Sequence, residues 1–442
     1  MQKKYINQNI QPFNTKVNSK GNHEISGCDL VELAKKYKTP LYVVDKVTLE
    51  KIANEYIEAF SSYKKTKILF ASKALMTSQI AKIFNKFGFG FDVVSMGEMY
   101  TILKAGIKLD KSSFNGNNKS EEEIEFAIDN NIDHFSVDNF YELEILNKIA
   151  KKKNKVQKIH LRITPNIECH THEYIQTGQM DSKFGFNLDT VDEVVELILN
   201  QYKNLELKGL HAHIGSQIFE TQVYFDEVGI LFEQIKRIKD KFNITIDEIN
   251  LGGGLGITYT NEDNPPSTFE IASVIIEAIK QNCKKYDINE PVLYIEPGRS
   301  LVCTAGVSLY TIGSSKEIKG VRKYITVDGG MADNPRPSMY QAKYAAVIAN
   351  KKEEEDKSEI VTVAGRFCES GDILIKDIEL NNPKSGDILC VFATGAYCYS
   401  MSSNYNSVLK PAMVLVENGK SDIIVKRQTL EQLCQNDVCI EE

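Results

Sequence analysis

KILFASK, residues Lys67 to Lys73, is an apolar run that ends on a lysine. Runs of this length, followed by a helix-compatible segment such as Met76 to Phe87, are typical of a buried parallel strand that leads into its crossover helix. Lys73 then lies at the carboxyl end of the strand. Burial disfavours the cation and lowers the pKa of a lysine, so a neutral amine able to condense with a carbonyl is expected there. The alternative is a lysine at a strand edge whose charge reaches solvent.

Seven more strand-like runs follow, separated by segments of helical length and amphipathic spacing. The runs are Gly90 to Ser95, Ser113 to Asn117, His134 to Asp138, Lys158 to Pro165, Leu207 to Ser216, Glu248 to Gly254 and Val292 to Arg299. The helical segments include Glu121 to Asn130, Val191 to Asn200, Thr221 to Phe242 and Thr268 to Tyr286. Eight strands alternating with helices predict an α/β fold, a parallel (β/α)8 TIM-type barrel over residues 41–305. A doubly wound open sheet is the alternative.

After Arg299 the pattern changes to short strand-like pieces divided by Gly, Asp, Asn and Pro, which predicts an all-β domain over residues 306–442. The pieces are SLYTIG, KYITVDGG, EIVTVAGRFC, DILIKDIEL, DILCVFATGAY, PAMVLVENG and SDIIVKR. Residues 1–40 contain no barrel strand, and we expect them to pack on the β domain.

The 442 residues exceed the size at which one core usually stops growing, so two domains are expected. Hydrophobic residues make up 42% of the chain, and no apolar run is long enough to span a bilayer, so no membrane partner is expected. The net charge of -7 argues against a nucleic-acid partner. The amino-terminal MQKKYINQNIQPFNT lacks the apolar core of a secretory signal, which predicts a cytoplasmic location. The nine cysteines form no C-x-x-C pair, so neither a zinc cage nor a disulfide framework is indicated.

Two motifs lie at the ends of predicted strands. The first is NLGGGLGI near the seventh strand, which contains Gly252, Gly253 and Gly254. These glycines have no Cβ atoms, so backbone N–H groups can approach a phosphate, and phosphate sites of barrels commonly form at this place. His211 and His213 in LHAHIGSQ are two residues apart, so both side chains are expected on one face of the sixth strand.

Such a histidine pair could also bind a metal, which leaves a metal-dependent barrel hydrolase open as a competing function. That site needs further ligands, and the CHTHE cluster at Cys169 to Glu173 could supply them. We favour a site without a metal, in which one imidazole packs on a flat cofactor ring and the CHTHE cluster is a loop.

Glu296, in the run IEPGR, ends the eighth predicted strand. A carboxylate that faces a pyridine nitrogen keeps the ring protonated and makes it a strong electron sink. Arg299 offers a fork suited to a carboxylate or phosphate. The β domain supplies the remaining candidates, which are Arg336, Tyr340, Cys368, Glu369 and Tyr397.

Together these residues resemble the fold-type III, pyridoxal-phosphate-dependent decarboxylases related to alanine racemase, and among them the diaminopimelate decarboxylases. The match runs in order along nearly the whole chain. Its motifs are FASKA, FDVVSMGE, THEYIQTGQMDSKFG, HIGSQ, GGGLGI, EPGR, DGGMADNPRPSMY, CESGD and GAYCYSMSSNYN. The resemblance implies a barrel plus a β domain and a homodimer with two active sites at the dimer interface.

The resemblance also implies a role for each candidate residue. Lys73 would bond to the aldehyde of pyridoxal 5'-phosphate, and Cys368 would come from the partner subunit to protonate the carbanion after carbon dioxide leaves. His213 would stack on the pyridine ring and Glu296 would pair with its nitrogen. Groups that hold the phosphate or the nearby ring would be Ser216, Gly253, Gly254 and Tyr397. Substrate contacts would be Arg299, Arg336 and Tyr340 for the carboxylates and Glu369 for the distal ammonium. Arg299 is also expected to contact the cofactor, and Tyr397 the substrate.

The reaction predicted from this resemblance is decarboxylation of meso-2,6-diaminopimelate to L-lysine, the last step of lysine biosynthesis. Glu296 disfavours racemisation, because alanine racemase places an arginine opposite the ring nitrogen. Ornithine and arginine decarboxylases typically carry an aspartate where this chain has Glu369, and a decarboxylase of another basic amino acid or of carboxynorspermidine is the alternative within the fold. A non-catalytic pyridoxal-phosphate carrier lacks a β domain. Cys169 and His170 depart from the family pattern and leave local metal affinity or redox sensitivity open.

Overall fold

The computed structural model describes residues 4–165, 182–352 and 358–440, and the chain divides into two compact units. The barrel unit comprises residues 53–256 and 265–300, and the sheet unit comprises residues 1–52, 257–264 and 301–442. α2 (Lys46–Ala59) and α10 (Arg299–Val302) each contain a boundary between the units. The predicted barrel limits, residues 41–305, therefore differ from this division at both ends.

Eight parallel strands of the barrel unit form a closed ring in the order β5-β6-β7-β8-β9-β11-β12-β13. Pairing of β8 with β9 and of β13 with β5 completes the ring, so the predicted (β/α)8 barrel is confirmed and an open sheet is wrong. The strands are β5 (Thr66–Ala71), β6 (Gly90–Val93), β7 (Ser113–Phe114), β8 (His134–Val137), β9 (Gln157–Thr164), β11 (Leu205–His211), β12 (Glu248–Asn250) and β13 (Val292–Ile295), and the short β10 (Phe186–Asn187) pairs with β9.

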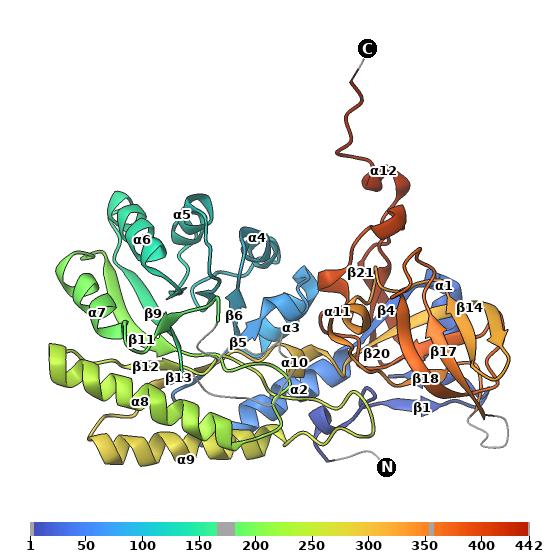
Figure 1. Cartoon of the computed structure of the whole chain (residues 1–442), viewed down its shortest axis with the longest axis horizontal. Helices are drawn as coiled ribbons and strands as arrows, with labels where there is room; N and C mark the ends of the chain where they lie inside the picture. Colours follow the sequence, from blue (N-terminus) through green and yellow to red (C-terminus); the bar gives the residue numbers. More distant parts are fainter. Residues whose placement is uncertain (1–3, 166–181, 353–357, 441–442) are drawn as a thin grey trace. The chain divides into compact units, whose positions relative to one another are not determined.

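Helices of the barrel unit follow the strands in alternation, as the amphipathic spacing predicts. They are α3 (Ser78–Lys86), α4 (Met96–Lys104), α5 (Glu121–Asp129), α6 (Phe140–Lys152), α7 (Val191–Asn200), α8 (Gln222–Phe242) and α9 (Thr268–Tyr286). The two longest, α8 and α9, lie side by side (Figure 1). α9 begins with a capping box in which Ser267 and Glu270 satisfy each other's backbone N–H groups. None of the described helices is both long and apolar enough to cross a membrane.

The sheet unit is built on a nine-stranded sheet that includes the path β18-β17-β15-β14-β4-β20-β21, with β19 paired to β14 and β16. β4 (Leu41–Asp45) pairs antiparallel with β14 and parallel with β20, which explains why the barrel does not begin at residue 41. The other strands are β14 (Gly306–Ile318), β15 (Arg322–Val327), β16 (Ala346–Ile348), β17 (Ser358–Ala364), β18 (Ile373–Asn381), β19 (Ile388–Val391), β20 (Ala412–Glu417) and β21 (Lys420–Val425). The short helices are α11 (Arg336–Tyr340) and α12 (Leu430–Leu433), with 3-10 turns η5 (Tyr399–Met401) and η6 (Tyr405–Ser407).

The amino-terminal segment packs on this sheet, as predicted. It contains η1 (Ile6–Gln8), β1 (Thr15–Val17), β2 (His23–Ile25), β3 (Cys28–Asp29) and α1 (Leu30–Tyr37). Ile25 and Leu30 are fully buried in one hydrophobic core with Leu41, Leu309 and Val414 from the large sheet. Burial of such side chains stabilises the contact by about 1.5–3 kcal/mol each.

A buried ion pair fixes two turns of the barrel unit. Lys119, between β7 and α5, lies 2.7 Å from Glu142 of α6, and both side chains are only 2% exposed. The Lys119 ammonium also donates to the backbone carbonyls of Gly116, at 2.8 Å, and Ser136, at 2.9 Å. These contacts hold the residues that follow β7 against β8.

Replacing Lys119 with Met should lower the free energy of unfolding by about 3–5 kcal/mol, because Glu142 would remain buried without its cation. The second substitution Glu142→Leu should restore most of that loss, since an apolar pair has no charge to desolvate. Urea unfolding of the two variants measures both values. A loss below about 1 kcal/mol for Lys119→Met would show that the pair contributes little.

Candidate active site

Three predicted site residues follow strands of the barrel at the same end. Lys73 lies in the 3-10 turn η2 (Ser72–Ala74) after β5, His213 lies two residues after β11, and Glu296 directly follows β13. Because all eight strands are parallel, their carboxyl ends meet at one face of the barrel, the face where reacting groups of such barrels gather. These three residues therefore lie together at the carboxyl-end face of the barrel.

The Glu296 side chain is held by contacts from three other residues. The Asn250 side-chain amide, at the end of β12, donates to its Oε1 at 2.7 Å, and the Asn115 amide, after β7, donates to the same oxygen at 3.2 Å. The Nε2 atom of His211 lies 3.4 Å from its other oxygen. Asn115 comes from a strand that does not neighbour β13, so these contacts cross the barrel interior.

The surroundings of Glu296 favour its protonated form. Burial raises its pKa to about 8, and the negative charge of Asp92 adds to the rise, while the Asn250 amide and the positive charge of Lys73 oppose it. A carboxyl group with this pKa can hold or release a proton near neutral pH. It is therefore suited to share a proton with a ring nitrogen, as a pyridinium partner must.

The two histidines of LHAHIGSQ differ in burial and in hydrogen-bond partners. His211 is fully buried, and its Nδ1 lies 2.5 Å from the Ser136 hydroxyl. His213 is half-buried, and its Nδ1 accepts a hydrogen bond from the backbone N–H of Gly253 at 3.2 Å. Burial and the positive charge of Lys73 lower the pKa of His213 well below its usual value, so its ring is neutral at pH 7. Within the described ranges neither histidine belongs to a three-ligand cluster, and the CHTHE cluster of the competing metal-site hypothesis lies outside those ranges.

The glycine triplet allows a close approach between loops. A Cβ on Gly253 would lie 2.4 Å from the backbone oxygen of Glu296, and one on Gly254, whose φ is +94°, would lie 2.7 Å from the oxygen of Gly215. Larger residues would therefore separate the ends of β11, β12 and β13. The triplet does not open a helix directly, because α9 begins only at Thr268.

Arg299 and Ser216 meet beside this loop. The Arg299 guanidinium donates to the Ser216 hydroxyl through Nη2, at 3.0 Å, and Nε, at 3.3 Å. Arg299 is 7% exposed, so its charge is held in place rather than extended into solvent. A serine hydroxyl, a fixed guanidinium and glycine backbone N–H groups are the donor set that a phosphate or carboxylate requires.

The burial of Lys73 differs from the prediction. Its side chain is exposed, so the expected burial of the amine is wrong for this structure. Its charge nevertheless acts on its neighbours, since it lowers the pKa of both Glu296 and His213.

The sheet unit holds the other predicted site residues. The Arg336 guanidinium is buried, donates to the Tyr344 hydroxyl at 2.6 Å and lies 4.7 Å from the ring centre of Tyr259. Tyr340 ends α11 and is half-buried, as is Tyr397, whose φ is +60°.

Cys368 and Glu369 follow β17 and both side chains are exposed. The backbone N–H of Cys368 donates to the Asn406 side chain at 2.9 Å, and its carbonyl accepts from the Tyr405 hydroxyl at 3.3 Å. The backbone of Cys368 is thus fixed while its thiol remains accessible. The motif THEYIQTGQM and the departures Cys169 and His170 lie outside the described residues.

Sequence reasoning missed the residues that surround Glu296. Asn115 and Asn250 hold its carboxyl group, and Asp92 accepts a hydrogen bond from Asn115 at 2.5 Å. Arg162, inside β9, is buried and lies 3.9 Å from Asp138. Each of these residues lies within or just after a predicted strand. In the sequence, that position is the feature that could have marked it as a site candidate.

Comparison with known proteins agrees with this geometry. Residues 49–303 match the family described as pyridoxal-dependent decarboxylase, pyridoxal binding domain. The chain is 46% identical to the diaminopimelate decarboxylase of Bacillus subtilis (strain 168), covering 95% of this chain and 96% of that protein. It is 47% identical to the diaminopimelate decarboxylase of Bacillus methanolicus, covering 94% and 96%. Among solved structures, the diaminopimelate decarboxylase of M. jannaschii in complex with L-lysine has a TM-score of 0.90 at 34% identity, covering 97% of this chain and 98% of that chain.

The raised pKa of Glu296 has a consequence for stability. Between the ordinary value of 4.5 and about 8 the folded chain holds this proton and the unfolded chain does not, so the free energy of unfolding falls as the pH rises through this interval. Glu296→Gln removes the titrating group. In the cofactor-free protein, the slope of the unfolding free energy against pH should therefore be less negative for Glu296→Gln than for the unaltered chain, by about 1.4 kcal/mol per pH unit.

Urea unfolding of both proteins between pH 5.5 and 7.5, about the middle of that interval, measures the difference in slope. Parallel pH profiles would contradict the assignment of a protonated Glu296.

Proposed function

This chain belongs to the pyridoxal-dependent decarboxylase family, and from that premise we propose that it decarboxylates meso-diaminopimelate to L-lysine and carbon dioxide with pyridoxal phosphate. One structural observation carries the proposal. Lys73 and Glu296 follow the neighbouring strands β5 and β13, so an amine that can bond an aldehyde lies beside a buried acid that can hold a ring nitrogen. The names of the relatives supply the substrate.

The residues at this face suit the cofactor. Lys73 would bond to its aldehyde, His213 would stack on the ring as a neutral imidazole, and Glu296 would pair with the ring nitrogen. The hydroxyl of Ser216 and the backbone of Gly253 and Gly254 would hold the phosphate, with Arg299 fixing Ser216 in place. Tyr397 would add a further contact.

When bound, the cofactor accepts the electron pair that remains on Cα after carbon dioxide leaves. The chain's part is to keep the ring nitrogen protonated, and the acid Glu296 does this because Asn250 and Asn115 fix its oxygen toward the interior. The amide groups carry no charge, so they orient Glu296 without forcing it to ionise.

Substrate selection falls to residues with fixed charges. We assign Arg299, Arg336 and Tyr340 to the substrate carboxylates and Glu369 to the distal ammonium. Arg336 is prepared for this role, since Tyr344 and Tyr259 hold its guanidinium in one orientation. A substrate with a second amino acid centre uses both arginines, whereas ornithine or arginine has no distal carboxylate for one of them.

We assign Cys368 as the acid that returns a proton to Cα, acting from the partner subunit of a homodimer. Support comes from its exposed thiol on a fixed backbone, and from the exposure of the adjacent Glu369 in the single chain. The eight cysteines of the described ranges are all free thiols, which supports a reducing compartment, the cytoplasm, as the location.

Carbon dioxide release from meso-diaminopimelate, L-ornithine, L-arginine and carboxynorspermidine tests the substrate. With added pyridoxal phosphate, meso-diaminopimelate alone should react and yield L-lysine, because only it offers both carboxylates. Lys73→Ala should abolish release, and borohydride reduction of the unaltered chain should leave the cofactor on the peptide that contains Lys73. Faster turnover of another substrate would refute the assignments of Arg336 and Glu369.

Replacing Cys368 with Ala should slow lysine formation by about 10²- to 10⁴-fold, the usual contribution of a positioned acid, while cofactor content stays unchanged. Cys434→Ala is the matched control, because its thiol is also exposed, and it should react at the normal rate. Single-turnover rates of the two variants make the comparison. Equal rates would remove Cys368 from the reaction.

A further inference from the structure

Three ligand-type side chains converge in the barrel interior near the amino ends of the strands. His134 begins β8, His160 lies in β9 and Glu248 begins β12. β8 and β12 are not neighbours, so the contact between His134 and Glu248 crosses the interior. All three residues are buried, and none takes part in the function proposed above.

The geometry of this cluster is that of converging ligands. The Nε2 atoms of His134 and His160 each lie 2.8 Å from the same oxygen of Glu248, Oε2. Only His160 reaches that oxygen with hydrogen-bond geometry, and Nε2 of His134 is a buried polar atom without a hydrogen-bond partner. One ligand atom from each residue lies within 4.8 Å of the other two.

The intervening strand leaves room for the cluster. Gly209 of β11 pairs with His160 on one side and with Glu248 on the other. A Cβ on Gly209 would lie 2.8 Å from the His160 ring and 2.9 Å from Cβ of Glu248. The missing side chain therefore lets the imidazole and the carboxylate meet across the strand that separates them.

Further polar groups orient the ligands from outside. Asp133 lies 3.1 Å from Nδ1 of His134, the arrangement by which a metal-bound histidine usually donates its second N–H to a carboxylate. The Tyr294 hydroxyl donates to the other oxygen of Glu248 at 3.3 Å, and the Lys67 ammonium donates to Tyr294 at 2.7 Å. Nδ1 of His134 is thus occupied, which leaves its Nε2 to face the interior.

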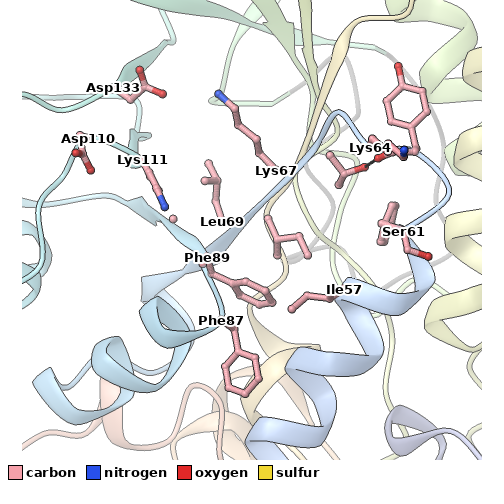
Figure 2. A pocket seen from close by; sticks show the side chains of 16 residues that line it. Ile57, Ser61, Lys64, Lys67, Leu69, Phe87, Phe89, Asp110, Lys111 and Asp133 are labelled. Carbon is pink, nitrogen blue, oxygen red and sulfur yellow. Dashed lines mark hydrogen bonds between the residues drawn. The ribbon is translucent and has the colours of Figure 1, made fainter.

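A pocket of about 500 Å³ is lined by two residues that contact the cluster or its neighbour Tyr294. Its lining includes Lys67 and Asp133, which contact Tyr294 and His134 respectively. Figure 2 shows the charged ends of these two side chains toward one end of the pocket and the rings of Phe87 and Phe89 toward the other.

We propose that His134, His160 and Glu248 form a binding site for a zinc-type divalent metal ion, with water in the remaining position. Two imidazole nitrogens and one carboxylate oxygen, with an open fourth position, are a frequent zinc ligand set. The competing structure is a metal-free hydrogen-bond network that closes this end of the barrel. The proposed site binds a metal ion, whereas the hydrogen-bond network does not.

Equilibrium dialysis of the chelator-treated holoenzyme against zinc chloride, with metal analysis, decides between them. One zinc ion per chain should bind, and Glu248→Gln or His160→Gln should abolish that binding. Asp133→Asn should weaken it by about 10- to 100-fold, because it removes the group that orients His134. No bound zinc in the unaltered chain would overturn the proposal, and this measurement does not depend on whether the variants fold.

The double variant Cys169→Ser/His170→Asn is the control for the other metal-type residues in the sequence, and it should retain its zinc. Loss of zinc from that variant, with retention in Glu248→Gln, would move the site elsewhere and refute the proposal. Cobalt(II) in place of zinc gives a second check on the unaltered chain. Its spectrum should lack the charge-transfer band of a thiolate ligand, because the proposed ligands are nitrogen and oxygen atoms only.

Discussion

Closure of the eight strands is the constraint on which the rest of the barrel unit depends. Pairing of β13 with β5 joins segments more than two hundred residues apart, and it places Glu296 beside Lys73. If the ring were open between β13 and β5, these two strands would lie at opposite edges of the sheet, and the acid and the amine would be far apart. The chemistry of the site is therefore a consequence of ring closure before it is a consequence of any single residue.

Ring closure also divides the interior into layers. Side chains two residues apart on a strand share a face and are separated by about 6.6 Å along it. His134 and Ser136 follow this spacing on β8, and Glu248 and Asn250 follow it on β12. The first member of each pair lies in the histidine cluster, and the second lies in the network around His211 and Glu296. The histidine cluster is thus the layer directly beneath the site.

The sequence predicted the fold well because both periodicities are strong, with eight apolar strands and intervening amphipathic helices. It also singled out Lys73 and Glu296 as candidates, since their charges end apolar strands. It could not identify Asn115 and Asn250, because an uncharged amide at a strand end looks like an ordinary turn residue until the ring brings it to Glu296. The predicted barrel limits, residues 41–305, include Leu41–Asp45, which joins the large sheet of the other unit, because an apolar strand carries no mark of the sheet that it joins.

Two buried glutamates on neighbouring strands show how the layers differ. Burial opposes ionisation of both, yet the neighbouring imidazoles of His134 and His160 lower the pKa of Glu248, whereas Glu296 has amide donors and the charge of Asp92 nearby and its pKa is raised. Amides orient a carboxyl group without fixing its charge, while imidazoles can accept the proton that it releases. The pKa of the same residue type is therefore lowered in one layer and raised in the next. This separation allows a single narrow barrel to contain both, because each carboxyl group takes its charge state from the donors in its own layer.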